Sequence, residues 1–366
     1  MTRVPENLRI LVAGGGTGGH LFPGIAVAEA VRDLAPDCRI LFAGTGKPFE
    51  ARATEAAGFD HVGLDVEGFS GRSLGKKLVA GAKLSVSMAR AVAATARYRP
   101  HAVLGVGGYS SAPWVLSAAL LNINTAIQEQ NVAPGAASRL GGRVAGRVYV
   151  SWPQSARYFP GREVRLTGNP VRPSLLARAK GEEKPAGPFT VAVLGGSQGA
   201  AGINRAVIQC LAGLSDPAGI RFILQTGQAD FADAEAALAK HPGGGEAAPF
   251  YQDMGRIYAR ADLLVCRCGA TTMAEVTALG KAAILVPFPF AAENHQEKNA
   301  RFLEEAGAAR VILESALTGP GLANMIEELK GDPGKIAEME EKSRALGRPD
   351  AAMDLARDLL DWIGGN

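Results

Sequence analysis

Near its N-terminus the chain reads Arg9-Ile-Leu-Val-Ala13, then Gly14-Gly-Gly-Thr-Gly-Gly19, then His20-Leu-Phe-Pro23. A short apolar run followed by glycines is typical of a buried strand that ends in a tight loop. The spacing of apolar residues predicts a helix over Pro23–Ala35, because proline suits the first helical turn. A strand, a glycine loop and a helix in this order predict an α/β fold that can bind phosphate at the start of the helix.

The glycine spacing alone does not identify a ligand. Gly14, Gly16 and Gly19 satisfy the pattern G-x-G-x-x-G of dinucleotide-binding folds. The next expected strand, Arg39–Ala43, runs into Gly44-Thr45-Gly46-Lys47 and lacks the acid that would hold a ribose. A nicotinamide cofactor is therefore disfavoured. A different phosphate-bearing ligand and a tight turn without a ligand remain as alternatives.

The same pattern starts again in the second half, with a strand over Phe189–Leu194, a glycine loop over Gly195–Gly199 and a helix over Ala200–Leu214. Further strands are expected at Arg39–Ala43, Ala102–Val106, Asn124–Ile127, Val148–Ser151, Val164–Leu166, Arg221–Gln225, Leu263–Cys266 and Ala283–Val286. Strands that alternate with helices predict an α/β fold with parallel sheets, here two doubly wound, Rossmann-like domains facing a deep cleft.

The length of 366 residues suits two such domains. The boundary is expected at Thr167–Pro170, directly after a strand, although the polar segment Lys180–Pro188 is an alternative linker. This division gives domains 1–170 and 171–349, with a C-terminal helix at about 350–366 expected to pack back on the first.

Composition excludes several classes of protein. No apolar stretch reaches the roughly 18 residues of a membrane span, and the N-terminus does not resemble a secretory signal. The four cysteines show no C-x-x-C spacing, so neither a disulfide framework nor a zinc site is expected, and the cytoplasm is the natural compartment.

Charge is unevenly distributed along the chain. Residues 1–170 contain 19 Lys and Arg against 11 Asp and Glu, a balance of +8, whereas residues 171–366 contain 20 against 25, a balance of −5. No acid occurs from residue 68 to residue 128, where seven basic residues fall. A one-sided basic region indicates an anionic partner, which could be a nucleic acid, a phosphate or a membrane surface.

Several polar residues follow the expected strands. His20 begins the first helix and could either pack locally or shuttle a proton at a cleft. Glu129, between Gln128 and Gln130, could act as a general base on a sugar hydroxyl or lie at a solvated loop end. Glu275 could bind a ribose or simply favour the helix dipole. The cluster Glu293–Gln296 could serve sugar hydroxyls or cap a helix.

Six motifs occur in order along the chain, and together they resemble the MurG family of peptidoglycan N-acetylglucosaminyltransferases over roughly residues 8–360. They are Gly14-Gly-Gly-Thr-Gly-Gly-His20, Gly107-Gly-Tyr-Ser-Ser-Ala-Pro113, Glu129-Gln-Asn131, Thr167-Gly-Asn-Pro-Val-Arg172, Gly195-Gly-Ser-Gln-Gly-Ala200 and the segment Arg267–Glu275. The resemblance implies a GT-B fold. It also implies transfer, with inversion, of N-acetylglucosamine from UDP-N-acetylglucosamine to the 4-hydroxyl of the N-acetylmuramyl sugar of undecaprenyl-linked lipid I, which gives lipid II.

The resemblance also implies roles for individual residues. The first loop, with Thr17, Gly18 and Gly19, would serve the donor and the acceptor phosphate. The other implied substrate contacts are Asn131 on the donor sugar, Arg172 and Ser197 on the diphosphate, the backbone of Tyr251 on uracil, Ala270, Thr271, Thr272, Met273, Ala274 and Glu275 on phosphate and ribose, and Gln296 on the N-acetylglucosamine hydroxyls.

The sequence departs from the family pattern at three places. Gln128 stands where many relatives have histidine, Cys268 replaces a common serine, and the loop Phe288–Gln296 is one residue longer than in some relatives.

The expected chemistry needs no cofactor and no metal. UDP is a good leaving group, so helix N-termini, Ser197 and Arg172 can stabilise its charge. The incoming hydroxyl needs a base, for which His20 and Glu129 are the candidates. The rival functions are a UDP-N-acetylglucosamine epimerase, which needs no acceptor surface, and a non-catalytic nucleotide-sugar sensor. Nucleic-acid binding is disfavoured because aromatic residues are few.

A lipid-linked acceptor implies docking at the cytoplasmic face of the cell membrane. Segment Leu74–Val92 combines apolar residues with Lys76, Lys77, Lys83 and Arg90, a composition that suits peripheral insertion at an anionic leaflet. An ordinary surface helix is the alternative. The implied partners are UDP-N-acetylglucosamine, lipid I, the anionic membrane surface and other cell-wall synthesis proteins.

Overall fold

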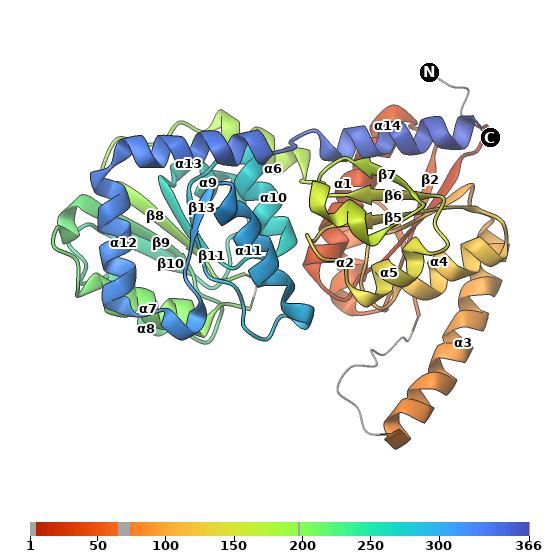
Figure 1. Cartoon of the computed structure of the whole chain (residues 1–366), viewed down its shortest axis with the longest axis horizontal. Helices are drawn as coiled ribbons and strands as arrows, with labels where there is room; N and C mark the ends of the chain where they lie inside the picture. Colours follow the sequence, from red (N-terminus) through yellow and green to blue (C-terminus); the bar gives the residue numbers. More distant parts are fainter. Residues whose placement is uncertain (1–4, 65–73, 197, 366) are drawn as a thin grey trace. The chain divides into compact units, whose positions relative to one another are not determined.

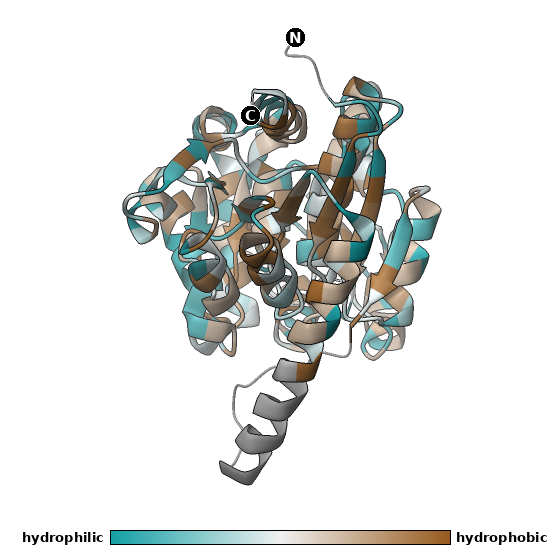
Figure 2. Ribbon diagram, turned by 90° about the vertical axis from the view of Figure 1, so that its right-hand side faces the viewer, coloured by the Kyte–Doolittle hydropathy of each residue, from teal (hydrophilic) through white to brown (hydrophobic). Residues whose placement is uncertain are grey.

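The computed structural model describes residues 5–64, 74–196 and 198–365, without the side chains of residues 74–85. The chain forms two compact units (Figure 1). Unit 1 comprises residues 1–172 and 350–366, and unit 2 comprises residues 173–349. Each unit is built on one parallel sheet, and apolar residues gather on the central strands (Figure 2).

The sheet of unit 1 has seven strands in the order β3-β2-β1-β4-β5-β6-β7, all parallel. Their bounds are β1 Arg9–Ala13, β2 Arg39–Gly44, β3 Asp60–Gly63, β4 Ala102–Gly105, β5 Asn124–Glu129, β6 Arg147–Val150 and β7 Glu163–Leu166. The chain winds outward from β1 to β3 and then crosses back to place β4 beside β1. This reversal is the switch point at which doubly wound folds bind ligands.

Helices cover both faces of this sheet because side chains alternate along each strand. The helical segments of unit 1 are α1 Gly18–Leu34, α2 Pro48–Ala56, α3 Leu74–Tyr98, α4 Ser111–Leu120, α5 Ala136–Gly142, η1 Pro153–Tyr158 and α14 Ala351–Gly364. Ile10 and Val12 of β1 pack in one apolar core with α1 and α14. Leu11 and Ala13 point to the opposite face and pack with Ala91 of α3 and Trp114 of α4.

Helix α14 brings the C-terminus of the chain onto unit 1. Leu355, Leu359 and Ile363 recur at helical spacing and are buried against α1 in the core. Each such side chain contributes about 1.5–3 kcal/mol when it is removed from water. Asp358 on the same helix pairs with Arg147 and accepts a hydrogen bond of 2.8 Å from the Tyr149 hydroxyl, which ties α14 to β6.

Unit 2 repeats the winding of unit 1 with six parallel strands in the order β10-β9-β8-β11-β12-β13. Its strands are β8 Phe189–Leu194, β9 Ile220–Gln225, β10 Gly245–Ala248, β11 Leu263–Cys266, β12 Ala283–Leu285 and β13 Ala309–Val311. Its helical segments are α6 Pro173–Gly181, α7 Ala201–Leu211, η2 Pro217–Gly219, α8 Phe231–Leu238, α9 Met254–Arg260, α10 Ala270–Leu279, η3 Ala292–Asn294, α11 His295–Glu305, η4 Glu314–Ala316, α12 Gly319–Gly331 and α13 Pro333–Leu346. The switch point lies between β8 and β11.

The predicted start of the first helix is wrong. Helix α1 begins at Gly18, with Thr17 as an extended N-cap, and Pro23 lies in the second turn of the helix. The first turn is therefore built from the last two glycines of the loop and His20. This arrangement brings the end of the glycine loop and the histidine into one rigid element.

No helix among the described residues is long and apolar enough to span a membrane. The side chains of Lys76, Lys77 and Lys83, on which the membrane-docking hypothesis rests, lie outside the described part of α3.

Candidate functional site

The two glycine loops leave the first strand of each sheet at the switch point. In unit 1, the loop after β1 lies beside the loop after β4. A Cβ atom on Gly108 would lie 2.4 Å from the carbonyl oxygen of Gly15, so glycine is required where these two backbones meet. In unit 2, a Cβ atom on Gly199 would lie 2.0 Å from the carbonyl oxygen of Thr226. Both loops are therefore packed turns, and only part of each is open to a ligand.

His20 lies half-buried in the first turn of α1, at the carboxyl edge of the unit 1 sheet. Its Nδ1 atom is 3.2 Å from the Thr17 hydroxyl. A Cβ atom on Gly107 would lie 2.6 Å from Cδ2 of the imidazole, so the absence of a side chain at Gly107 makes room for the ring. Thr17, exposed before the helix, thus helps to orient a histidine that solvent can reach.

The segment Gln128–Asn131 is not a solvated loop end. Gln128, Glu129 and Gln130 are buried at the end of β5, and the alternative of a solvated loop is wrong. The Gln130 amide donates to the Val106 carbonyl at 2.6 Å, which joins β5 to the loop after β4. The Gln128 amide donates to the Asn169 side chain at 3.3 Å, which joins β5 to the segment before Arg172.

Glu129 is 1% exposed, and its carboxylate is hydrogen-bonded to other groups of the protein. It accepts hydrogen bonds from the backbone N–H and the side-chain amide of Asn131, at 2.8 and 3.2 Å. Burial raises the pKa of Glu129, and hydrogen bonds from Ser138 and Asn131 lower it. Glu129 therefore holds Asn131, whereas His20 is the base candidate with an exposed surface.

Arg172 is the last residue of unit 1. Its guanidinium carbon lies 4.8 Å from the centre of the Phe22 ring, which supports the cation from one side. Phe22 belongs to α1, two residues after His20, so the arginine is held beside the helix that carries the histidine. An arginine stacked in this way keeps its charge and presents several donors to a phosphate.

In unit 2 the N-terminus of α10 faces the switch point. Its N-cap is Gly269, which has no side chain that could cap the first turn of Ala270, Thr271 and Thr272. Met273 and Ala274 are buried, so contacts of these two residues with a ligand would be made by the backbone. A helix N-terminus of this kind suits a phosphate group.

Glu275 lies in the second turn of α10, and its Oε2 atom accepts a hydrogen bond of 2.7 Å from the buried Tyr258 hydroxyl. No acid occupies the first turn, so the simple dipole interpretation of Glu275 is wrong. The tyrosine orients the half-buried carboxylate. Sequence reasoning missed Tyr258 because it belongs to another helix, α9.

Gln296 and Tyr251 are both held by hydrogen bonds within unit 2. The Gln296 side-chain oxygen accepts from the backbone N–H of Cys268 at 3.1 Å and of Phe288 at 3.0 Å, which joins the loops after β11 and β12. The side-chain NH2 group of Gln296 is therefore the part that would contact a ligand. The Tyr251 N–H donates to the Gln225 side chain at 3.1 Å. Ser197 lies outside the described residues.

Arg267, another residue that sequence reasoning did not single out, connects the loops at the carboxyl ends of β11 and β12. It pairs with Glu314 at 2.6 Å and donates to the carbonyls of Val286 and Pro287, both at 3.3 Å. The pair therefore ties the segment before α10 to the end of β12 and to η4.

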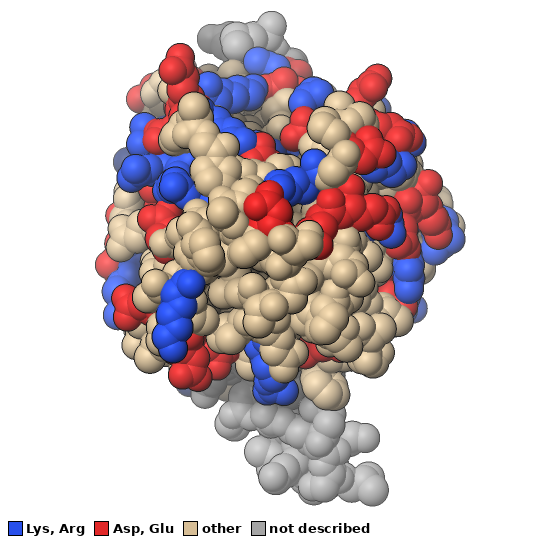
Figure 3. Space-filling view, turned by 90° about the vertical axis from the view of Figure 1, so that its left-hand side faces the viewer, with Lys and Arg blue, Asp and Glu red and all other residues tan. Residues whose placement is uncertain are grey.

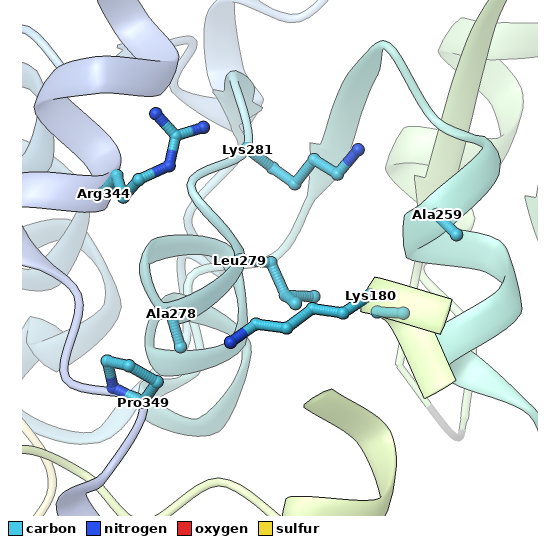
Figure 4. A pocket seen from close by; sticks show the side chains of 8 residues that line it. Lys180, Ala259, Ala278, Leu279, Lys281, Arg344 and Pro349 are labelled. Carbon is cyan, nitrogen blue, oxygen red and sulfur yellow. The ribbon is translucent and has the colours of Figure 1, made fainter. Parts of the chain in front are cut away.

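A cavity of about 470 Å³ in unit 2 lies at the amino ends of the strands, opposite the switch point (Figure 4). Lys180, Lys281 and Arg344 line it together with small apolar residues. Lys281, which comes just before β12, donates to the carbonyl of Ala261, which comes just before β11, at 2.8 Å. Burial lowers the pKa of Lys281. Because this cavity adjoins the amino ends of the strands, it is separate from the switch-point site.

No group of three or more His, Cys, Asp or Glu side chains among the described residues is arranged to hold a metal ion. The face in Figure 3 carries acidic and basic side chains intermixed, so in the described part of the chain that face offers no continuous basic track for a nucleic-acid backbone.

Comparison with known proteins identifies the relatives of the chain. Residues 10–150 match the glycosyltransferase family 28 N-terminal domain, and residues 190–355 match the corresponding C-terminal domain. The UDP-N-acetylglucosamine--N-acetylmuramyl-(pentapeptide) pyrophosphoryl-undecaprenol N-acetylglucosamine transferase of Myxococcus xanthus is 41% identical over 357 residues, 97% of this chain and 93% of that protein. The protein of the same name from Syntrophus aciditrophicus is also 41% identical, over 97% of this chain and 99% of its own length.

Solved structures agree. The crystal structure of Acinetobacter baumannii MurG matches with a TM-score of 0.79 at 29% identity, over 97% of this chain and 99% of that one. A putative UDP-N-acetylglucosamine 2-epimerase from Listeria monocytogenes, 13% identical over 99% of this chain and 98% of that one, matches with a TM-score of 0.69 and shares only the fold. The predicted GT-B fold and the family resemblance are confirmed, and the chain belongs to the MurG family within glycosyltransferase family 28.

Proposed function

We infer that this protein transfers N-acetylglucosamine from UDP-N-acetylglucosamine to the 4-hydroxyl of the N-acetylmuramyl sugar of undecaprenyl-pyrophosphoryl-N-acetylmuramyl-pentapeptide (lipid I), with inversion at the anomeric carbon. The observation that carries this inference is the 41% identity over nearly the whole chain to transferases of that name. The acceptor-dependent reaction, rather than epimerisation of the donor, is the activity that those relatives' names state.

Unit 2 is proposed to bind the donor. The backbone N–H groups at the start of α10 would donate hydrogen bonds to the diphosphate, and the carboxylate of Glu275, oriented by Tyr258, would accept hydrogen bonds from the ribose hydroxyls. The backbone at Tyr251 would meet uracil, and the amide of Gln296 would meet the sugar. Ser197 is proposed as a further contact to the diphosphate on the family resemblance alone.

Unit 1 is proposed to bind the acceptor and to supply the base. The acceptor hydroxyl attacks the anomeric carbon as the bond to the UDP oxygen breaks, and the hydroxyl proton passes to His20. Glu129 fixes Asn131 through two hydrogen bonds, and Asn131 would contact the donor sugar. Thr17, Gly18 and Gly19 would contact the acceptor phosphate. Arg172 and the α10 amides would stabilise the charge that develops on UDP without a metal.

The direct test is to measure UDP release with donor alone and with donor plus a short-chain analogue of lipid I, in the presence of EDTA. We expect release that depends on the acceptor and that chelation does not reduce. Release with donor alone at the same rate would contradict the transferase assignment. Loss of turnover in EDTA that Mg²⁺ restores would contradict the metal-free mechanism.

Replacing Glu275 with alanine should weaken UDP binding by about 1.5–3 kcal/mol, because a hydrogen bond to a charged group is lost. The Tyr258→Phe variant keeps the carboxylate and removes only the hydroxyl that orients it. Its loss should be smaller, about 0.5–1.5 kcal/mol. Isothermal titration calorimetry measures both, and unchanged affinity in Glu275→Ala would remove Glu275 from the site.

Replacing His20 with alanine should lower the transfer rate by about 10²–10⁴-fold while UDP affinity is retained, because the base is lost. Glu129→Gln keeps an oxygen for Asn131 and should lower the rate less. Because burial raises the pKa of Glu129, ionisation of this carboxyl lowers the free energy of unfolding as the pH rises through that pKa. A neutral glutamine at this position should therefore not lower the free energy of unfolding near neutral pH. A larger rate loss in Glu129→Gln than in His20→Ala would reverse the assignment.

Peripheral membrane association is proposed from the nature of the acceptor and from the basic, apolar sequence Leu74–Val92. Each cation near an anionic leaflet contributes about 1 kcal/mol. Reversing the charge of Lys76, Lys77 and Lys83 together should release the protein from anionic vesicles in a sedimentation assay and spare transfer to a soluble acceptor. Sedimentation equal to that of the unaltered protein would exclude this segment as the docking surface.

A further inference from the structure

A fully buried carboxylate lies beneath the first glycine loop. Glu50 belongs to the first turn of α2 and is 0% exposed. Its oxygens accept hydrogen bonds from the N–H and the hydroxyl of Thr45, both at 2.7 Å, and from the N–H of Gly16. The Nε2 atom of His61 on β3 lies 3.6 Å from Oε2. One side chain thus joins the loop after β1, the loop after β2 and strand β3.

Two glycines make space for this carboxylate. A Cβ atom on Gly15 would lie 2.5 Å from Oε1 of Glu50, and one on Gly44 would lie 2.3 Å from Oε2. The absence of a Cβ atom at both positions therefore leaves room for the Glu50 carboxylate. A buried carboxylate is costly unless hydrogen bonds compensate it, and three donors at hydrogen-bonding distance do so here.

The Glu50 carboxylate is bonded to Gly16, which directly precedes the candidate site residue Thr17. Gly16 has a φ of +88°, and no heavy atom lies within 4 Å of where its Cβ would be, so packing does not hold this residue from that side. The next residue, Thr17, forms the N-cap of α1 and lies 3.2 Å from His20 Nδ1 through its hydroxyl. The Glu50 carboxylate is therefore an anchor for the backbone that leads to both Thr17 and His20.

We propose that Glu50 is a positioning residue for transfer to the acceptor. It touches no substrate, because it is buried, and it acts by fixing Gly16 and thereby the geometry of Thr17–Gly19 and of the His20 ring. The proposal rests on the proposed function, in which this loop and His20 serve the acceptor. Donor binding, assigned to unit 2, should not depend on Glu50.

The test compares Glu50→Gln and Glu50→Ala with Thr54→Ala as the matched control. Thr54 is also fully buried on α2, but its hydroxyl donates to the carbonyls of Glu50 and Ala51 in its own helix. The control therefore perturbs the same helix and leaves the bond to Gly16 in place. The measurements are urea unfolding, UDP calorimetry, steady-state kinetics with a soluble acceptor, and amide hydrogen exchange of residues 14–20.

Glu50→Ala should bind UDP as the unaltered protein does, exchange the loop amides faster, and lose about 100-fold in kcat/KM for the acceptor, because misplacing a site by about 1 Å costs that much. Glu50→Gln, which is isosteric, should fold even where alanine does not, and should show a smaller loss. Thr54→Ala should change the unfolding midpoint and leave acceptor kinetics within twofold.

Acceptor kinetics in Glu50→Gln and Glu50→Ala within twofold of the unaltered protein would overturn the proposal. A loss in Thr54→Ala equal to that in the Glu50 variants would also overturn it, because the effect would then be one of stability. If the unaltered protein lacks acceptor-dependent transfer, the proposed function itself fails. In that case loop exchange that is unchanged in Glu50→Ala would still reject the anchoring role.

Discussion

In both sheets the winding reverses beside the first strand, and the placement of the candidate site residues follows from this constraint. Because β4 crosses back to lie next to β1, the loops after these two strands lie side by side at the carboxyl edge, where doubly wound folds bind ligands. The glycine loop and His20 follow β1, and Gly107 follows β4. In unit 2 the same reversal sets the glycine loop after β8 beside the start of α10. In each unit the candidate site residues therefore lie at the ends of strands and the starts of helices beside the switch point.

Buried and half-buried polar side chains then fix the loops beside each switch point. Gln130 joins β5 to the loop after β4, and Glu129 holds Asn131. In unit 2, Gln296 joins the loops after β11 and β12, and Tyr258 orients Glu275. Each of these groups would cost free energy if it were buried without its partner. These hydrogen bonds hold the loops beside each switch point in the arrangement that the structure shows.

The central strands were the most predictable part of the fold. The predicted bounds of β1, β8 and β11 agree with the structure to the residue, because these strands are buried on both faces and read as continuous apolar runs. Of the four edge strands, β7 was predicted at Val164–Leu166, whereas β3, β10 and β13 were not predicted. Their residues are largely half-buried or exposed, and two of them contain glycine, so they lack an apolar signature. Sequence pattern reports burial, and an edge strand is formed by pairing with its neighbour more than by burial.

For the polar residues of the site, too, the sequence does not show contacts that form only between separate parts of the folded chain. The motif residues could be found because they fall at fixed places in the chain, directly after a strand or at the start of a helix. Tyr258 and Glu50 could not be found in this way, since each acts on a partner 17 or 34 residues away in the sequence. Their contacts exist only after the chain has folded.

Glu50 also changes how the glycines of the first loop should be interpreted. A run of glycines after a strand indicates that something approaches the backbone closely, but the sequence does not say what. At Gly15 and Gly44 the approaching group is the Glu50 carboxylate, and at Gly108 it is the carbonyl of Gly15. Of the residues in the first loop, Gly16 has open space at its Cβ position, and Thr17 and Gly19 are exposed. The part of the loop that can face a ligand therefore begins at Gly16, and the glycines before it are required by the protein's own packing.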